Sequence, residues 1–186
     1  MKENLLTGLL NQKSIQFLFK IFEDYQDDMA LSGGCVRDFF LEKTTKDFDV
    51  ATKLSPSRII KILNKNNLKY ETYAFKYGSI STIIQNQKFQ ITTLREDFNQ
   101  TGRDTNILFT DCWKKDAARR DFTINTIYLF SDGKIKDFFF GKEDLEENTV
   151  RFLGKIEDKI QEDFLRIFRY YRFLGVFKRP KLIKGY

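Results

Sequence analysis

The stretch MALSGGCVRDFFLEKTTKDFDVAT, residues 29–52, decides the fold of this chain. Met29 to Ser32 is predicted as a short strand that leads into the glycine pair Gly33-Gly34, and Val36 to Leu41 is predicted as a helix. Polar and apolar residues then alternate from Asp47 to Thr52, as they do in a half-buried strand. The stretch therefore predicts a strand, a glycine turn, a helix and a second strand within a mixed α/β domain.

The glycine turn and the second strand could carry phosphate and metal chemistry. Backbone N–H groups of a glycine pair can approach a phosphate closely, and Arg37 could neutralise its charge. Side chains at i and i+2 of a strand share a face, so Asp47 and Asp49 would project together and could hold one or two Mg²⁺ ions. Two carboxylates holding two such ions are the minimum for in-line phosphoryl or nucleotidyl transfer. The alternative is a solvated strand face, and the spacing from the glycine turn favours the functional interpretation.

Composition restricts the classes of function. The chain has 186 residues and a net charge of +6, which favours an anionic partner such as nucleic acid or a nucleotide over a basic protein with no such partner. The absence of histidine from the sequence excludes imidazole zinc sites and His-based catalytic triads. Two cysteines, Cys35 and Cys112, are too few for a disulfide framework. We expect no membrane span, no secretory signal, and a cytoplasmic location, with the mitochondrial matrix as the alternative.

The rest of the chain predicts a β-rich middle and a helical end. Leucines from Leu5 onward and apolar residues as far as Phe22 recur at helical spacing. Further expected helices are a helix from Ser55-Pro56 to Asn64 and helices over 114–120, 143–147 and 156–175. Expected strands are 70–74, 79–84 and 89–94, followed by a loop over 96–112 with strand character near 107–109. Residues 124–130 are expected to form a further strand or a passage from helix to strand. We expect a mixed α/β domain over about 1–140 and a helical module over 141–186.

A second cluster reads Arg119-Arg120-Asp121, followed by Asn125. The guanidinium groups can clamp a triphosphate, and Asp121 or Asn125 could bond a ribose hydroxyl. The alternative is a basic helix end in which arginine complements the helix dipole.

A third cluster, Glu162-Asp163-Phe164-Leu165-Arg166, lies in the last predicted helix. A helical wheel places Phe164, Ile167, Phe168, Tyr171 and Leu174 on one face and Glu162, Arg166 and Arg169 on the other. A surface ion pair at i,i+4 is the plain interpretation. A carboxylate beside a guanidinium also matches the Watson–Crick edges of cytosine and adenine, and it mismatches those of uracil and guanine.

In this order, the three motifs resemble those of the class II tRNA nucleotidyltransferases, the CCA-adding enzymes that share a catalytic head with bacterial poly(A) polymerases. The resemblance runs from about residue 29 to 177. It implies an α+β head of the DNA polymerase β type with a small mixed sheet, followed by an all-helical neck. It also implies template-independent addition of C and A, from CTP and ATP with Mg²⁺, to the 3′ end of tRNA.

The resemblance assigns roles to individual residues. It assigns metal binding and catalysis to Asp47 and Asp49. Triphosphate and ribose binding falls to Gly33, Gly34, Arg37, Asp38, Arg119, Arg120, Asp121 and Asn125. Base recognition falls to Glu162, Asp163, Arg166, Arg169 and Arg172.

Three features depart from the family pattern. Gln90 stands where the family often has an acidic residue, and the flexible loop over 95–113 reads Thr101-Gly102-Arg103-Asp104 instead of D-G-R-H. Family members usually continue into body and tail helical domains that grip the tRNA. We therefore expect a truncated chain, a chain that needs a second subunit, or a minimal enzyme that acts as a homo-oligomer. The functional alternatives are CC addition, A addition, poly(A) synthesis, and a non-catalytic RNA-binding subunit.

Overall fold

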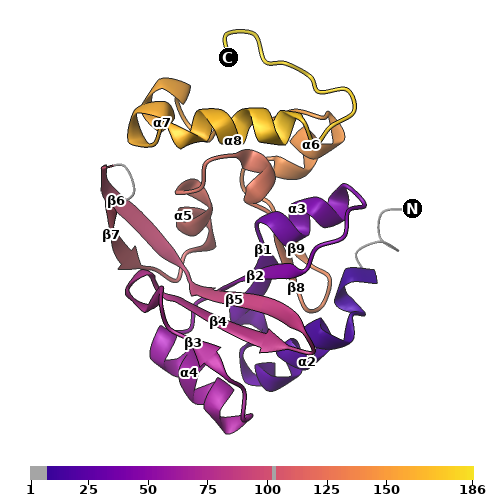
Figure 1. The fold of residues 1–186 in the computed structure, drawn as a ribbon, viewed down its shortest axis with the longest axis vertical. Coiled ribbons are helices and arrows are strands. Elements are labelled where there is room, and N and C mark those ends of the chain that lie inside the picture. Colours follow the sequence, from indigo (N-terminus) through magenta and orange to yellow (C-terminus); the bar gives the residue numbers. More distant parts are fainter. Residues whose placement is uncertain (1–7, 102–103) are drawn as a thin grey trace.

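A computed structural model describes residues 8–101 and 104–186, and a mixed seven-stranded sheet forms its centre (Figure 1). In spatial order its strands are β3 (Tyr70–Glu71), β4 (Ser79–Ile84), β5 (Gln87–Thr93), β2 (Asp47–Thr52), β1 (Met29–Ser32), β8 (Tyr128–Phe130) and β9 (Ile135–Lys136). The β2–β5 pair is parallel and the other pairs are antiparallel. The predicted α+β head with a small mixed sheet is confirmed.

Strand β2 shows why this sequence places its carboxylates outside the core. Its burial alternates at first, so Phe48 and Val50 are buried and Asp47 and Asp49 are exposed. Phe48 stacks on Phe89 of β5, with ring centroids 5.0 Å apart. Since successive side chains of a strand point to opposite faces, burying the phenylalanine turns both aspartates to the other side.

Helices α2 (Lys13–Ile21) and α4 (Pro56–Lys65) lie at one end of the molecule. Ser55 caps α4 as predicted, because its hydroxyl accepts a hydrogen bond from the Arg58 N–H at 3.3 Å. Buried residues of both helices join the main core with Phe48 and Phe89. The predicted apolar N-terminal spacing is confirmed from Leu9 to Phe22, while Leu5 and Leu6 lie outside the described residues.

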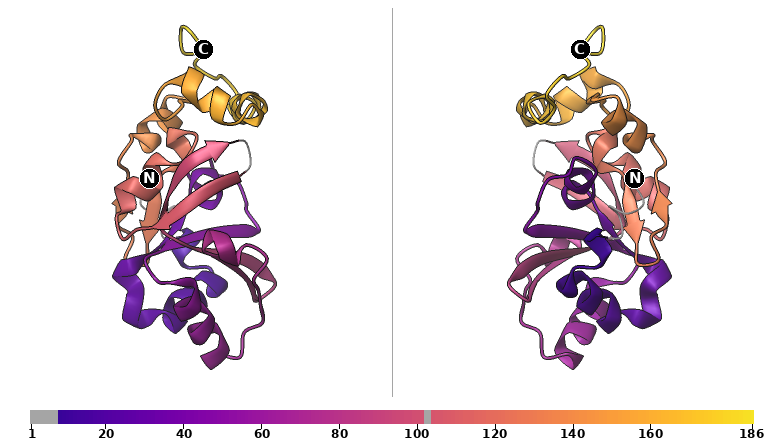
Figure 2. Two further views of the ribbon diagram at one scale, coloured as in Figure 1. Left: turned by 90° about the vertical axis from the view of Figure 1, so that its left-hand side faces the viewer. Right: turned by 90° about the vertical axis from the view of Figure 1, so that its right-hand side faces the viewer.

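The short helix η1 (Glu23–Asp28) lines one pocket with α2 and α4, and η2 (Phe75–Tyr77) directly precedes β4. The helices toward the opposite end of the molecule are α3 (Gly34–Phe40), α5 (Trp113–Ala118), η3 (Thr123–Asn125), α6 (Gly141–Glu146), α7 (Ile156–Glu162) and α8 (Leu165–Leu174). Figure 2 shows α7 and α8 crossing this end of the molecule, with a separate two-stranded ribbon projecting toward them. Among the described residues, no helix is long and apolar enough to cross a bilayer.

That ribbon corrects the loop predicted over 96–112. Strands β6 (Arg95–Thr101) and β7 (Asp104–Phe109) pair antiparallel, with Glu96 opposite Leu108. Ion pairs support the ribbon, including Lys115 to Glu96 at 3.0 Å. Apolar alternation does not reveal a ribbon held by backbone hydrogen bonds and charges. The Gly102-Arg103 part of the predicted flexible-loop motif lies outside the described residues.

The single helix predicted over 156–175 is in fact two helices. Asp163 has an extended backbone, and its Oδ1 accepts a hydrogen bond from the Leu165 N–H at 3.0 Å. This side chain therefore caps α8 and ends α7, a competition that periodicity alone does not show. Of the two alternatives predicted over 124–130, the structure has the passage from helix to strand, because η3 precedes β8.

Candidate active site

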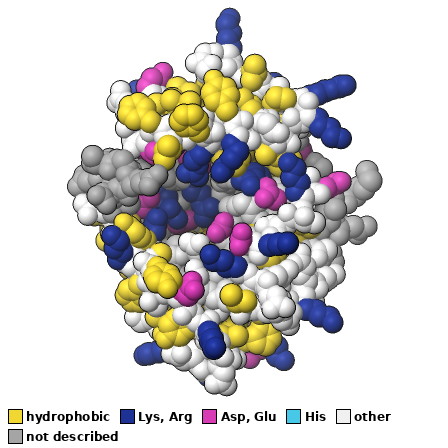
Figure 3. Space-filling model, in the orientation of Figure 1, with side chains coloured by type: hydrophobic (Ala, Val, Ile, Leu, Met, Phe, Trp, Pro, Cys, Tyr) yellow, Lys and Arg dark blue, Asp and Glu magenta, His cyan; other side chains and the backbone are white. Residues whose placement is uncertain are grey.

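A cavity of about 630 Å³ opens between the sheet and helix α8. Figure 3 shows Lys and Arg side chains gathered in a hollow of the surface, with apolar side chains above and below it. Among the described residues, the cavity lining includes Arg37, Arg95, Arg119, Arg120, Arg166, Arg169 and Arg172. These positive charges share the lining with the carboxylate of Asp49.

The glycine turn holds the backbone close to this carboxylate. Gly33 has φ 66°, and a Cβ placed on it would lie 3.2 Å from the Asp49 Oδ2 and 3.2 Å from an Arg120 nitrogen. Only glycine adopts this conformation without strain and leaves space for both side chains. The turn, Asp49 and Arg120 thus form one continuous surface of the cavity.

Asp49 has an environment suited to a cation. Although its side chain is open to the cavity, the surrounding protein partly desolvates the carboxylate and raises its pKa; Asp47 adds to this rise, while Arg120 and the Gly34 N–H oppose it. Such a carboxylate gains from a nearby positive ion, and hard oxygen ligands suit Mg²⁺.

The ligands available for such an ion are few. Gln90 stands opposite Asp49 across the β2–β5 pair, so an amide takes the place of a third carboxylate. Among the described residues, no cluster of three or more His, Cys, Asp or Glu is placed to hold a metal. Asp47 and Asp49 therefore fit an ion that takes its other ligands from water and substrate phosphates.

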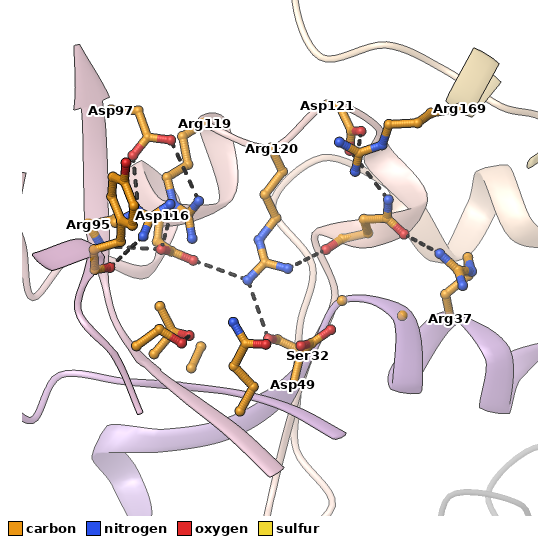
Figure 4. A pocket seen from close by; sticks show the side chains of 18 of the residues that line it. Ser32, Arg37, Asp49, Arg95, Asp97, Asp116, Arg119, Arg120, Asp121 and Arg169 are labelled. Carbon is orange, nitrogen blue, oxygen red and sulfur yellow. Dashed lines mark hydrogen bonds and ion pairs between the residues drawn. The ribbon is translucent and has the colours of Figure 1, made fainter. Parts of the chain in front are cut away.

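Asp116 organises the arginines on the α5 side of the cavity (Figure 4). Its carboxylate accepts hydrogen bonds from Arg119 at 2.9 Å and from Arg120 at 3.3 Å. It also accepts one from the Tyr128 hydroxyl at 2.7 Å and one from the Arg95 backbone N–H at 3.2 Å. Burial alone would raise the pKa of Asp116, but the two adjacent arginines and Tyr128 lower it to about 2. An ionised carboxylate therefore fixes two of the predicted triphosphate-binding side chains.

A chain of polar contacts joins the head to α8. Arg37 donates a hydrogen bond to the Asn125 side-chain oxygen at 2.8 Å, and Asn125 donates to Asp121 at 3.4 Å. Asp121 forms an ion pair with Arg169 of α8 at 2.7 Å. Arg37 also pairs with Asp38 at 2.7 Å. Residues from the first, second and third sequence clusters thus meet along one wall.

In the third sequence cluster, Asp163 and Arg166 line the cavity, while Glu162 bonds Arg166 from outside the lining. Arg166 is only 4% exposed, and it bonds Glu162 and, at 2.8 Å, the Lys159 carbonyl oxygen. The predicted ion pair between Glu162 and Arg166 is therefore present, and its arginine also lines the cavity. Asp163 reaches the cavity as well as capping α8.

The apolar face predicted for the last helix is largely exposed. Phe164, Ile167, Phe168 and Tyr171 form this face, and we call them the α8 outer face. Leu174 is buried instead, with Tyr170 and Phe173. The helix therefore turns its arginines and a second apolar set toward the head.

Most of the residues assigned by the sequence converge on this cavity. Those that line it are Gly33, Gly34, Arg37, Asp49, Arg119, Arg120, Asp121, Asn125, Asp163, Arg166, Arg169 and Arg172. The other three lie beside lining residues. Asp38 forms an ion pair with Arg37, Glu162 forms one with Arg166, and Asp47 is two residues from Asp49 on β2. Their individual roles remain predictions.

Residues 29–151 match the poly A polymerase head domain. The chain belongs to this family. The zebrafish (Danio rerio) protein called CCA tRNA nucleotidyltransferase 1, mitochondrial, is 38% identical over 180 residues, which are 92% of this chain and 42% of the relative. The resemblance found in the motifs is therefore confirmed for the head.

Solved structures agree with this membership. The Bacillus stearothermophilus CCA-adding enzyme in complex with CTP has a TM-score of 0.75 at 28% identity, covering 88% of this chain and 39% of that one. A tRNA nucleotidyltransferase complexed with a primer tRNA and an incoming ATP analogue has a TM-score of 0.65 at 27% identity, covering 80% and 41%. The chain spans less than half the length of the curated relatives it matches.

Sequence reasoning missed several residues of this poly A polymerase head. Asp116 stands three and four residues before Arg119 and Arg120, a helical ion-pair spacing that could have revealed it. Arg95 is a second such residue, and it pairs at 3.1 Å with Asp97, which the sequence offered with Glu96 only as a substitute for the acidic residue absent at Gln90. Tyr77 lines the cavity without belonging to any polar motif.

Proposed function

We propose that this chain transfers nucleotides from CTP and ATP to the 3′ end of tRNA without a nucleic-acid template. One observation carries the proposal: Asp49, beside Asp47 on β2, faces a cavity whose other walls are lined with arginines. The fit of Asp47 and Asp49 to a hard cation and the names of the relatives support it.

In this proposal the chain's own residues bind and orient the two substrates. Arg37, Arg119 and Arg120, with the N–H groups of the glycine turn, bind the triphosphate, and Asp121 and Asn125 orient the ribose. Asp47 and Asp49 would hold Mg²⁺, which activates an attacking hydroxyl and stabilises a leaving pyrophosphate when bound.

The base would be read from α8. Asp163 and Arg166 present a carboxylate and a guanidinium to the cavity, and Glu162 holds Arg166 in place. Arg169 and Arg172 line the same wall. This pattern complements cytosine and adenine, so we propose it as the source of the C and A specificity.

We also propose that the chain divides into a catalytic head over 1–140 and a hinge with a helical neck over 141–186. A location where tRNA is matured, the cytoplasm or the mitochondrial matrix, follows from this function.

The test is incorporation on a tRNA that ends at the discriminator base, with Mg²⁺ and CTP, ATP, UTP or GTP separately, then CTP with ATP. Two C residues followed by one A are expected. Asp49→Ala should abolish incorporation while circular dichroism stays unchanged, and Asp132→Ala, an exposed carboxylate on a turn, should remain active. Turnover of Asp49→Ala near the parent rate would remove Asp49 from catalysis, and incorporation of UTP or GTP at the rate of CTP would contradict the proposed base recognition.

Activity that depends on a second polypeptide is the other candidate. The α8 outer face favours it, because an exposed apolar surface of this kind marks an interaction site. CTP binding without incorporation by the chain alone would support this candidate.

A further inference from the structure

Four aromatic side chains lie on or against the turn that contains η2, and we call them the aromatic rim: Tyr73, Phe75, Tyr77, which lines the cavity, and Phe109, whose ring packs on Gly78. Tyr73 is 91% exposed and Phe109 is 47% exposed. Exposed aromatic rings at the mouth of a polar site are costly unless they serve a contact. None of the roles proposed above uses them.

The rim stands on an ordered turn. Backbone hydrogen bonds close the turn, from Phe75 N–H to the Thr72 carbonyl at 2.9 Å and from Tyr77 N–H to the Ala74 carbonyl at 2.9 Å. Gly78 follows in the left-handed region with φ 78°, and the Phe109 ring packs on it so closely that a Cβ would clash. The Phe109 ring of β7 is therefore fixed against the end of the turn that carries the other three rings.

Positive charge accompanies the rings. The Lys76 ammonium lies 4.6 Å and the Arg95 guanidinium 5.8 Å from the centre of the Tyr77 ring. Arg95 also donates a hydrogen bond to the Tyr77 carbonyl oxygen and stands opposite Phe109 in the β6–β7 pair. Aromatic faces beside cations form the usual platform for unpaired bases and their phosphates.

The part of the cavity next to the aromatic rim is available to the acceptor RNA strand. In an in-line transfer the attacking hydroxyl approaches opposite the leaving pyrophosphate. The proposed triphosphate and base groups occupy the walls formed by α3, η3 and α8. Ala74, Tyr77, Ser79 and Thr92 also line the cavity, and the sheet connects them with Asp49, because Asp49 stands opposite Gln90 of β5 and Thr92 of β5 stands opposite Ser79 of β4.

We propose that the aromatic rim is the stacking platform for unpaired bases at the 3′ end of the acceptor RNA. This inference rests on the proposed function, because it assigns the second substrate of that reaction to a surface. Bases stack on the exposed rings, and Lys76 and Arg95 attract the adjoining phosphates.

The test uses the full chain and a short single-stranded RNA whose 3′-terminal base is 2-aminopurine, a fluorophore quenched by stacking. Binding to the parent should quench the emission. Tyr73→Ala should weaken binding about tenfold and restore the emission, since stacking on one aromatic ring contributes a factor of this order. Tyr73→Trp should keep the affinity and the quenching of the parent. The matched control is Phe168→Ala, because Phe168 is 74% exposed but lies on the α8 outer face and not on the turn that carries the aromatic rim.

Each result decides between named outcomes. Equal binding by Tyr73→Ala and the parent, equal loss in Phe168→Ala, or no quenching by the parent would overturn the platform. CTP incorporation is measured in parallel with the same variants. A parent that quenches the probe but incorporates nothing keeps the platform and contradicts the proposed function for the chain alone. If the parent incorporates CTP and Tyr73→Ala changes neither incorporation nor quenching, the proposed function stands and the stacking platform is contradicted.

Discussion

Asp116 holds Arg119 and Arg120 in place on the α5 side of the cavity. It is 1% exposed and accepts hydrogen bonds from Arg119, Arg120 and Tyr128. A buried charge of this kind is stable only while its partners remain, and the partners equally depend on it. Its contribution is therefore visible in stability as well as in ligand binding.

Replacing Asp116 by Asn should lower the free energy of unfolding by about 3–5 kcal/mol, because two partly buried guanidinium groups lose a counter-charge that they share. It should also weaken CTP binding, since Arg119 and Arg120 are no longer fixed. Urea denaturation and CTP titration measure the two effects. Tyr128→Phe is the control, with a cost of about 1 kcal/mol for one lost hydrogen bond. An Asp116→Asn protein as stable as the parent would contradict this account.

The same carboxylate predicts an acid limb of stability. Its pKa is about 2 in the folded chain, below the ordinary value of 3.8. A depressed pKa stabilises the folded state above the unfolded-state value, and this contribution of about 2 kcal/mol is lost as the pH falls from roughly 4 to 2. Unfolding measured across this range should show the loss in the parent and a smaller one in Asp116→Asn. Identical pH profiles would contradict it.

At the scale of elements, helix α6 fixes the position of η3. The Asp137 carboxylate caps α6 by accepting hydrogen bonds from the N–H groups of Gly141 at 3.0 Å and Lys142 at 2.8 Å. Thr123 of η3 donates a hydrogen bond to Asp144 of α6 at 2.6 Å. A Cβ on Gly141 would overlap the Thr123 carbonyl oxygen. The close approach of the two elements therefore requires glycine at this position.

Gly141→Ala should lower the free energy of unfolding by about 1–3 kcal/mol, as overpacking does. It should also weaken CTP binding, because η3 carries Asn125, the partner of Arg37. Thermal or urea unfolding and CTP titration measure both effects. Gly175→Ala is the matched control: its nearest neighbour would be 3.5 Å away, so stability should change by less than about 1 kcal/mol. Equal stability of the two variants would refute the proposed packing constraint.

The elements that the sequence predicted well are those set by local signals. Ser55-Pro56 marked the start of α4, and the alternation in β2 placed Asp47 and Asp49 on one face. The β6–β7 ribbon and the break at Asp163 could not be predicted in the same way. The first is held by backbone pairing and by ion pairs of β6 residues with each other and with residues 115 and 119, and the second by one side chain that bonds the backbone two residues later.

At the scale of the whole molecule, the sequence motifs predicted which residues meet but not the surface around them. Arg37, Arg120 and Arg169 come from separate segments that only the folded sheet brings to one cavity. The exposure of the α8 outer face could not be predicted from periodicity, because a helical wheel shows which residues share a face and not which face is buried. The cavity is therefore a property of the tertiary structure, bounded on one side by arginines and on the other by the aromatic rim.

This asymmetry predicts how salt should affect RNA binding. Contacts to phosphates release counterions, so log K for a single strand falls with log salt by about 0.7 per phosphate contacted, whereas stacking has little salt dependence. Arg95→Ala should therefore flatten the slope by about 0.7. Tyr73→Ala should weaken binding at every salt concentration and leave the slope unchanged. Fluorescence titrations from low to physiological salt measure both slopes, and a flatter slope in Tyr73→Ala would mean that the rim acts through charge and not through its rings.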